Sequence, residues 1–179
     1  AALLALLAVG FAGWLASLAA RDVSIVDSLW SLLFLLAAVV YATMMAGEIG
    51  RRGHMVLVLV ATWAVRLSAY IAWRSHGQPE DRRYAAMRQR NSPGFEWKSL
   101  YLVFGLQSVL AWILAAPLAV SMAGAPPLGW LDAAGAALWT FGFVFEALGD
   151  AQLARFKADP ANDGKVMDRG LWRYTRHPN

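Results

Sequence analysis

Four residues in the middle of the chain have side chains that could take part in chemistry, and their spacing would bring them together on one helix. These residues are Trp63, Arg66, Tyr70 and Arg74, which follow one another at intervals of three or four residues in an apolar stretch. Side chains at this spacing share one helical face. A charge at the centre of a membrane helix costs at least about 2.5–3.5 kcal/mol, so it usually serves a function. Arg74 suits snorkelling to headgroups at the helix end, whereas Arg66 lies deeper and favours a functional role or a buried ion pair.

Two carboxylates occupy a similar position in a later apolar stretch. Glu146 and Asp150 are four residues apart, and Lys157 falls near their face if the helix continues. Like charges at this spacing repel each other, so something positive is expected beside them, and an arginine, a bound ligand or a metal ion could supply it. No metal is expected, because no histidine has ligand spacing to these acids and the chain has no cysteine.

Three further polar or aromatic residues stand at or within apolar stretches. Asp27 and Trp30 belong to "VDSLWS" at the mouth of the second stretch. Asp27 fits the N-cap of a helix, with Ser28 as a competitor, and equally fits a functional acid. Gln107, in "VFGLQSVLAW", needs a partner when buried and fits either a contact between helices or a ligand contact.

Apolar stretches of membrane-spanning length make up most of the chain. Of the 179 residues, 59% are hydrophobic, and no charge occurs in 1–20, 28–47 or 99–131. About 20 apolar residues cross a bilayer. A soluble helical protein would retain too little polar surface, so we expect an all-α, multi-pass transmembrane helical bundle in one integral membrane domain over 1–179. Its spans are expected near 1–20, 28–47, 55–74, 99–123 and 128–148.

Basic residues concentrate in the segment between the third and fourth spans and in the segment after the fifth. Basic loops stay in the cytoplasm, so both segments are expected on that side, although Arg51 and Arg52 fall on the other. Arginines grip phosphates and aromatic rings stack on bases, so these loops suit a large anion with a flat ring, or alternatively lipid phosphates. Neither a G-x-G-x-x-G nor a P-loop motif is present, and no nucleic acid partner is expected.

Several motifs resemble those of one enzyme superfamily. The segment "GLWRYTRHPN", preceded by "LGDAQLARFK", resembles the C-terminal half of the steroid 5-alpha reductases and their sterol reductase relatives. "DSLWS", "RLSAYIAWR", "EDRRYAAMR" and "LQSVLAW" are similar to the bacterial branch, so the resemblance covers the chain from about Asp22. Isoprenylcysteine carboxyl methyltransferases carry a similar Arg-His-Pro turn, where they bind S-adenosylmethionine. The reductase motif continues into further helices, about seven in total, so the resemblance implies that this sequence is truncated at its C-terminal end.

The resemblance implies NADPH-dependent reduction of the 4,5 double bond of 3-oxo-steroids, or of a related flat enone lipid, in the bacterial inner membrane. Asp150, Lys157 and Asn179 match positions where the family grips the nucleotide, and Arg74 matches a cofactor contact. With the charged and aromatic residues of the basic loops, the expected cofactor-binding residues are Arg66, Arg74, Tyr84, Arg88, Glu146, Asp150, Lys157, Arg173, Arg176, His177 and Asn179.

Animal members of the family hold the ketone with a tyrosine one turn above the arginine and a glutamate on the second helix. Here Trp63 takes the tyrosine position and Asp27 is the nearest acid, so Asp27 and Tyr70 are the expected catalytic residues. Trp30, Trp63 and Gln107 are expected to line the substrate site. Membrane lipids are the other expected partners, and the sequence specifies no oligomeric state.

Two other functions remain open. One is an S-adenosylmethionine-dependent methyltransferase of the isoprenylcysteine type, and the other is a non-enzymatic protein that binds or transports lipid. The arginine-rich loop favours NADPH, because its 2′-phosphate and pyrophosphate need more cations than S-adenosylmethionine does. A transporter would be expected to show internal repeats, and none is visible.

Overall fold

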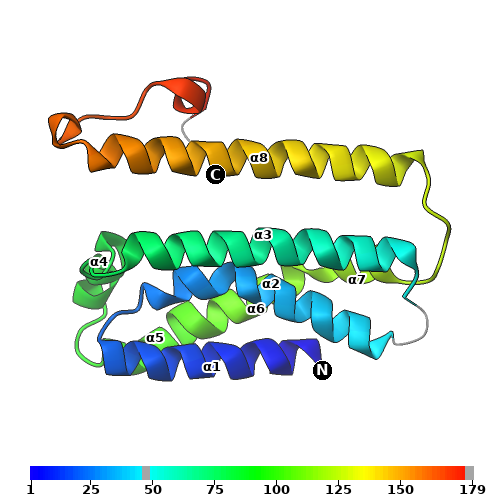
Figure 1. Cartoon of the computed structure of the whole chain (residues 1–179). Coiled ribbons are helices and arrows are strands. Elements are labelled where there is room, and N and C mark those ends of the chain that lie inside the picture. Colours follow the sequence, from blue (N-terminus) through cyan, green and yellow to red (C-terminus); the bar gives the residue numbers. More distant parts are fainter. Residues whose placement is uncertain (46–48, 176–179) are drawn as a thin grey trace. The chain divides into compact units, whose positions relative to one another are not determined.

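Helices account for the regular structure of the chain. The computed structural model describes residues 1–45 and 49–175. Helix makes up 79% of the structure, and these residues form no strand. Five helices are long and apolar enough to cross a membrane: Ala2–Ala20, Ile25–Met44, Arg51–Ser75, Phe95–Met122 and Trp130–Ala158. The expected all-α fold with five apolar spans is therefore confirmed (Figure 1).

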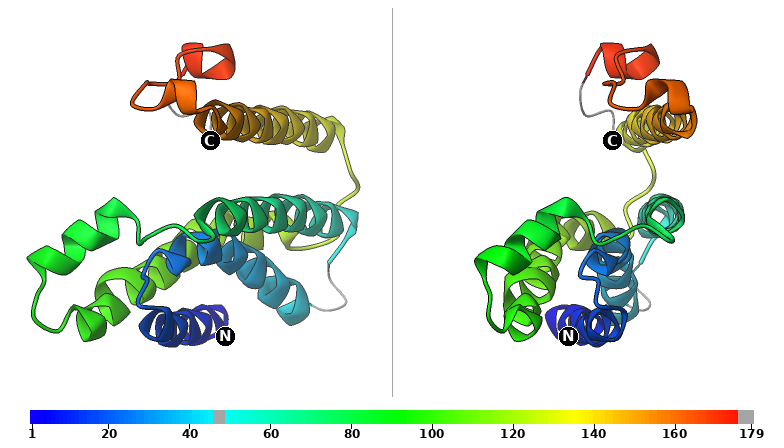
Figure 2. Two further views of the ribbon diagram at one scale, coloured as in Figure 1. Left: turned by 60° about the vertical axis from the view of Figure 1, so that its left-hand side comes forward. Right: turned by 90° about the vertical axis from the view of Figure 1, so that its left-hand side faces the viewer.

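The chain divides into two compact units, Ala1–Pro127 and Leu128–Asn179. In the first unit, α1 (Ala2–Ala20) packs against α2 (Ile25–Met44), and α2 packs against α3 (Arg51–Ser75). The second helix therefore has neighbours on two sides (Figures 1 and 2), and Asp27 in its first turn is partly exposed.

The fourth span is a helical stretch made of four segments. In chain order these are α5 (Phe95–Ser99), the π-helix η1 (Leu100–Gly105), α6 (Leu106–Leu114) and α7 (Ala116–Met122). Pro117 stands in the first turn of α7, where its missing N–H does not cost a helical hydrogen bond. α6 packs against α1 and α2, whereas α7 packs against α2 and α3. The fourth span therefore packs against all three of the other spans of the first unit.

Small residues let the helices of this unit approach closely. Gly10 of α1 faces Ser108 of α6, and a Cβ at Gly10 would collide with the Ser108 hydroxyl. That hydroxyl also donates a hydrogen bond to the Leu6 carbonyl at 3.2 Å. Leu6 and Leu33 are almost fully buried in the same region. Membrane helices commonly pack through small residues and hydroxyls in this way.

The start of α2 differs from the sequence-based expectation. The helix begins at Ile25, not near residue 28, and Ser24 is its N-cap residue. The Asp22 carboxylate accepts a hydrogen bond from the Ser24 N–H at 2.8 Å, and the helix follows directly. Asp27 therefore lies in the first turn, and its interpretation as the N-cap is wrong. Its carboxylate is engaged by a different element, α4.

The basic segment before the fourth span contains this short helix, α4 (Arg82–Arg90), which lies beside the start of the span (Figure 2). Asp81 caps it, because its carboxylate accepts a hydrogen bond from the Arg83 N–H at 2.8 Å. Hydrogen bonds from Arg83 hold the pKa of Asp81 below its usual range. The cap therefore stays charged at neutral pH.

The second unit consists of one long helix and a tail. α8 (Trp130–Ala158) continues through Lys157, beyond the expected span of 128–148, and the 3₁₀ turns Pro160–Asn162 and Gly170–Arg173 follow. The tail returns to its own helix: the Leu171 N–H donates to the Gln152 side chain at 2.9 Å, and the Trp172 indole donates to the Gly149 carbonyl at 2.9 Å. The "GLWRY" segment is thereby held against α8.

Candidate functional site

Two backbone contacts attach the entry of α4 to the entry of α2. The Val23 N–H donates to Glu80 Oε1 at 3.0 Å, and the Asp81 N–H donates to the Ser24 hydroxyl at 2.7 Å. These groups come from segments 57 residues apart in the sequence. The two helix entries are therefore held together, and the residues of their first turns face one another.

Arg88 strengthens the attachment from the other end of α4. Its guanidinium donates to both oxygens of Glu80, at 2.8 and 3.0 Å, and more weakly to Glu96 at 3.3 Å. The Glu80 side chain is 15% exposed. Hydrogen bonds from Arg88 hold the pKa of Glu80 below its usual range, against the opposing effect of burial. Arg88, expected to bind the cofactor, is thus largely occupied by carboxylates, and its role stays a prediction.

Replacing Glu80 should loosen this attachment. We expect Glu80→Gln to cost about 1–2 kcal/mol, because it weakens a charge-assisted bidentate contact at a partly exposed site. That corresponds to a melting temperature roughly 2–8 °C lower in detergent. A carboxyl with a lowered folded-state pKa contributes stability above its unfolded pKa and loses it as the pH falls through the folded pKa. The difference between the variant and the wild type should therefore shrink in acid.

Glu96→Gln is the matched control for this prediction. Glu96 is 58% exposed and has one contact with Arg88, at 3.3 Å. Its substitution should change the melting temperature by less than about 1 °C. Equal melting temperatures for the two variants would show that Glu80 does not anchor α4.

The centre of the candidate site is a hydrogen-bonded cluster of Asp27, Tyr84 and Gln107. The Tyr84 hydroxyl donates to Asp27 Oδ1 at 2.6 Å, and Gln107 Nε2 donates to the same hydroxyl at 3.5 Å. Arg83 donates to the other oxygen of Asp27 at 2.8 Å. Tyr84 is only 6% exposed. Three elements, α2, α4 and α6, thus place an acid, a phenol and an amide together.

The electrostatics of the cluster keep the phenol protonated. Burial raises the pKa of Tyr84 well above its usual range, and the hydrogen bond to Asp27 raises it further. Hydrogen bonding to Asp81, with the charges of Asp27 and Asp81, raises the pKa of Arg83 as well. At neutral pH the cluster therefore presents a neutral phenol beside an arginine-paired carboxylate.

Gln107 carries an acceptor that its surroundings do not satisfy. Its Oε1 is buried and has no hydrogen-bond partner among residues 1–45 and 49–175. Leaving such an acceptor unpaired costs about 1–3 kcal/mol. Gln107 directly follows Leu106, where the π-helix Leu100–Gly105 returns to α-helix. π-Helical turns often occur at functional sites because they re-aim side chains. The open acceptor suits a donor group brought by a ligand or a water molecule.

Aromatic rings continue from this cluster along α2 and α3. Asp27, Trp30 and Phe34 share one face of α2 by their spacing. The Trp30 and Phe34 ring centroids are 5.2 Å apart, and those of Phe34 and Trp63 are 5.9 Å apart. Trp30 and Trp63 therefore each lie beside Phe34, and their role in binding a substrate stays a prediction. Phe34 was missed by sequence reasoning, although its spacing from Trp30 marks it.

The arginines of α3 flank a tyrosine. Arg66 Cζ lies 5.4 Å from the Tyr70 ring centroid, and Arg74 Cζ lies 5.7 Å from it. The shared helical face expected from the spacing is confirmed. Cation–π contacts of this kind stabilise the stripe and hold its side chains in place. The phenol that donates to Asp27 is that of Tyr84, which sequence spacing did not reveal.

The remaining predicted residues belong to the second unit. Glu146 and Asp150 lie one turn apart on α8, and Asp150 is buried. Lys157 is exposed near the helix end, and Arg173 is exposed in the last 3₁₀ turn. Outside the described residues lie Arg176, His177 and Asn179. The predicted roles of all these residues in cofactor binding stay predictions.

The candidate site can be compared with known proteins. No curated protein and no solved structure matches the chain. A protein family described as a protein of unknown function, DUF1295, matches residues 13–179, and this family is broadly related to the steroid 5-alpha reductase superfamily. The match covers nearly the whole chain, including every element of the Asp27–Tyr84–Gln107 cluster. The chain therefore belongs to the DUF1295 family.

Proposed function

We propose that this protein is an NADPH-dependent reductase that acts on a carbon–carbon double bond conjugated to a ketone in a flat lipid, such as the 4,5 double bond of a 3-oxo-Δ4 steroid. The observation that carries the proposal is the buried Tyr84 hydroxyl, which donates to Asp27 and accepts from Gln107 Nε2. This pair of an acid and a phenol replaces the expected pair of Asp27 and Tyr70.

The chemistry needs a hydrogen-bond donor at the ketone. When bound, the cofactor supplies a hydride to the β-carbon of the enone, and negative charge then develops on the ketone oxygen. A neutral phenol in an apolar site stabilises that charge. Tyr84 meets this requirement, because burial and Asp27 keep its proton in place.

Asp27 and Arg83 allow the phenol to change partners. A phenol has one proton, so Tyr84 must release Asp27 to donate to the substrate oxygen. Asp27 is not left unpaired, because Arg83 remains on its other oxygen at 2.8 Å. Arg83 is 68% exposed, which connects the pair to water. Protonation of the α-carbon from water then completes the saturated ketone.

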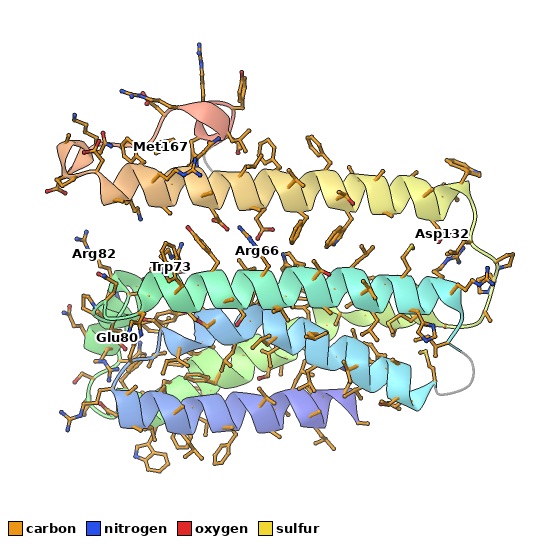
Figure 3. The ribbon with its side chains drawn as sticks, viewed as in Figure 1. Arg66, Trp73, Glu80, Arg82, Asp132 and Met167 are labelled. Carbon is orange, nitrogen blue, oxygen red and sulfur yellow. The ribbon has the colours of Figure 1, made fainter. Side chains whose placement is uncertain are left out.

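The residues around α3 and α4 suit a nucleotide with several phosphates. Arg74 and Arg82 are exposed and make no ion pair with any residue in the described ranges. Arg82 stands at the start of α4 and Arg74 at the end of α3, so both occupy the same end of the first unit (Figure 3). Guanidinium groups left available in this way fit phosphate oxygens. Arg82 is an addition to the residues expected from the sequence.

The proposal is tested by turnover with a defined enone. Purified protein in detergent should oxidise NADPH when given a 3-oxo-Δ4 steroid. It should not do so with the matched 3-oxo steroid that lacks the double bond, because no β-carbon is then available for hydride. Failure to oxidise NADPH, together with binding of S-adenosylmethionine, would favour a methyltransferase instead.

A further inference from the structure

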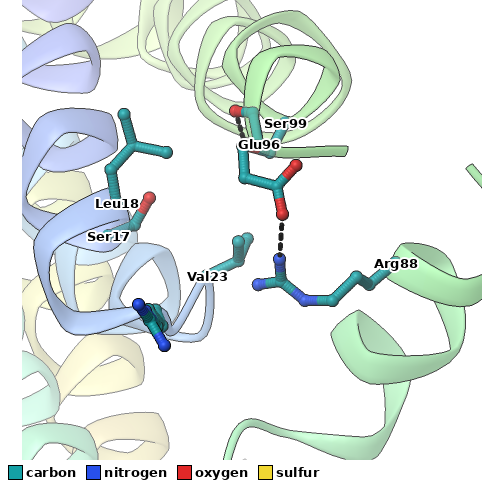
Figure 4. Close-up of a pocket in the computed structure, with 7 residues that line it drawn as sticks. Ser17, Leu18, Val23, Arg88, Glu96 and Ser99 are labelled. Atoms are coloured by element: carbon teal, nitrogen blue, oxygen red, sulfur yellow. Dashed lines mark hydrogen bonds and ion pairs between the residues drawn. The ribbon is translucent and has the colours of Figure 1, made fainter. Parts of the chain in front are cut away.

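A cavity separate from the Asp27–Tyr84–Gln107 cluster lies where α1 ends and the fourth span begins. Its volume is about 390 Å³, within the roughly 300–1,000 Å³ of small-molecule sites. The polar residues that line it are Ser17, Arg21, Arg88, Glu96 and Ser99. Figure 4 shows Arg88 extending from α4 toward Glu96 across this space. No residue of the proposed catalytic cluster lines the cavity.

The cavity lies at the level where two apolar spans reach the polar surface. Ser17 is in the last turn of α1, and Glu96 and Ser99 are in the first turns of the fourth span. Beside it, the Trp14 indole donates to the Glu96 carbonyl at 2.8 Å, and its ring lies 5.3 Å from that of Trp97. Trp97 is 70% exposed. Exposed tryptophan at the end of a span is typical of the headgroup region of a membrane.

The charges of the cavity are not all occupied. Arg88 is held by two carboxylates, mainly by Glu80. Arg21 is exposed directly after α1 and makes no ion pair with the residues that the structure describes. The carboxylate of Glu96 has a single contact among the described residues, to Arg88 at 3.3 Å, and the side chain is 58% exposed. The cavity therefore offers one available cation and one partly available carboxylate.

The two hydroxyls of the cavity have already used their protons. Ser17 Oγ donates to the Trp14 carbonyl at 2.7 Å, and Ser99 Oγ donates to the Glu96 carbonyl at 2.8 Å. Both serines are buried, Ser17 at 2% and Ser99 at 0% exposed, so neither hydroxyl is open to a ligand. The exposed carboxylate of Glu96 is the acceptor that the cavity offers, and a carboxylate suits a primary ammonium group, which has three N–H donors and no acceptor.

We infer that this cavity binds the headgroup of an aminophospholipid of the phosphatidylethanolamine type. The ammonium lies at Glu96, and the phosphate lies at Arg21. A zwitterion matches the one cation and one carboxylate, whereas an anionic headgroup would meet Glu96 unfavourably. A quaternary ammonium has no N–H to donate. This inference is independent of the proposed reductase activity.

Native mass spectrometry of the full chain tests the inference. The detergent-purified protein is exposed to equal amounts of phosphatidylethanolamine, phosphatidylcholine and phosphatidylglycerol with identical acyl chains. We expect phosphatidylethanolamine to be retained at least tenfold more than either of the others. Equal retention of all three lipids would overturn the inference, and this wild-type comparison does not depend on any variant.

Two variants test the ammonium contact and the phosphate contact of the headgroup separately. Arg21→Gln and Glu96→Gln should each lower the retention of phosphatidylethanolamine at least tenfold, and Glu96→Gln should not lower that of phosphatidylglycerol. Arg90→Gln, an exposed arginine of α4 that does not line the cavity, is the control and should bind normally. Melting temperatures confirm that each variant is folded.

Two competitors test other sources of the phosphate. Neither inorganic phosphate nor NADPH should displace the lipid if the cavity holds a lipid headgroup. Displacement by inorganic phosphate would indicate a simple anion site, and displacement by NADPH would assign the cavity to the nucleotide. Either result would contradict the inference, and displacement by NADPH would leave the proposed reductase intact.

Discussion

Tyr84→Phe should lower kcat for enone reduction at least ~100-fold and leave the Kd for NADPH within about twofold. The variant removes only the hydroxyl that donates to Asp27 at 2.6 Å, and it retains the buried ring. Removing one preorganised donor from a developing oxyanion typically costs a factor of about 10²–10³ in kcat. The effect should fall on kcat because the donor acts mainly when charge forms on the ketone oxygen. Steady-state kinetics with NADPH and a 3-oxo-Δ4 steroid measure both constants.

Tyr101→Phe is the matched control for this substitution. Tyr101 lies in the π-helix of the fourth span and is 62% exposed, so its hydroxyl is outside the cluster. The control should retain full activity. Full activity of Tyr84→Phe, with an intact fold, would mean that the phenol does not serve the ketone and would return Tyr70 to consideration.

Arg74→Gln should weaken NADPH binding more than tenfold, while kcat at saturating cofactor changes little. Arg74 is exposed at the end of α3 and is oriented by the Tyr70 ring at 5.7 Å. A hydrogen bond to a charged group contributes about 1.5–3 kcal/mol, and 1.4 kcal/mol corresponds to a factor of ten. Isothermal titration with NADPH measures the change.

The control for Arg74 is Arg51→Gln on the same helix. Arg51 is an exposed arginine at the opposite end of α3. Its removal lowers the net charge of the protein by the same amount, so it separates a local contact from a general electrostatic effect. Equal losses of affinity in the two variants would contradict a nucleotide site at the C-terminal end of α3.

Sequence periodicity predicted the parts of the structure that depend on one helix at a time. The apolar stretches gave the five spans, and the spacing of Arg66, Tyr70 and Arg74 gave their shared face. Both features follow from 3.6 residues per turn and from the apolar length that a bilayer requires. Neither depends on which helix packs against which.

Contacts between distant segments could not be predicted in this way. Asp27 and Tyr84 are 57 residues apart, and nothing in either local pattern states that they meet. The segment "RDVSIVDS" offers several residues able to cap a helix, and tertiary contacts to Glu80 and Asp81 accompany the start at Ile25. The sequence marked Gln107 as a polar residue in need of a partner. The direction in which its side chain points follows a π-helix that sequence patterns do not signal.

We propose that the cluster of Asp27, Tyr84 and Gln107 supports hydride reduction of an enone. The most direct test is a reaction with NADPH that carries deuterium at the transferred position, with the steroid product analysed by mass spectrometry. We expect one deuterium in a saturated 3-oxo product, formed in equal amount to the NADPH oxidised, and loss of this product in Tyr84→Phe. No deuterated product from a folded wild-type protein that binds NADPH would contradict it.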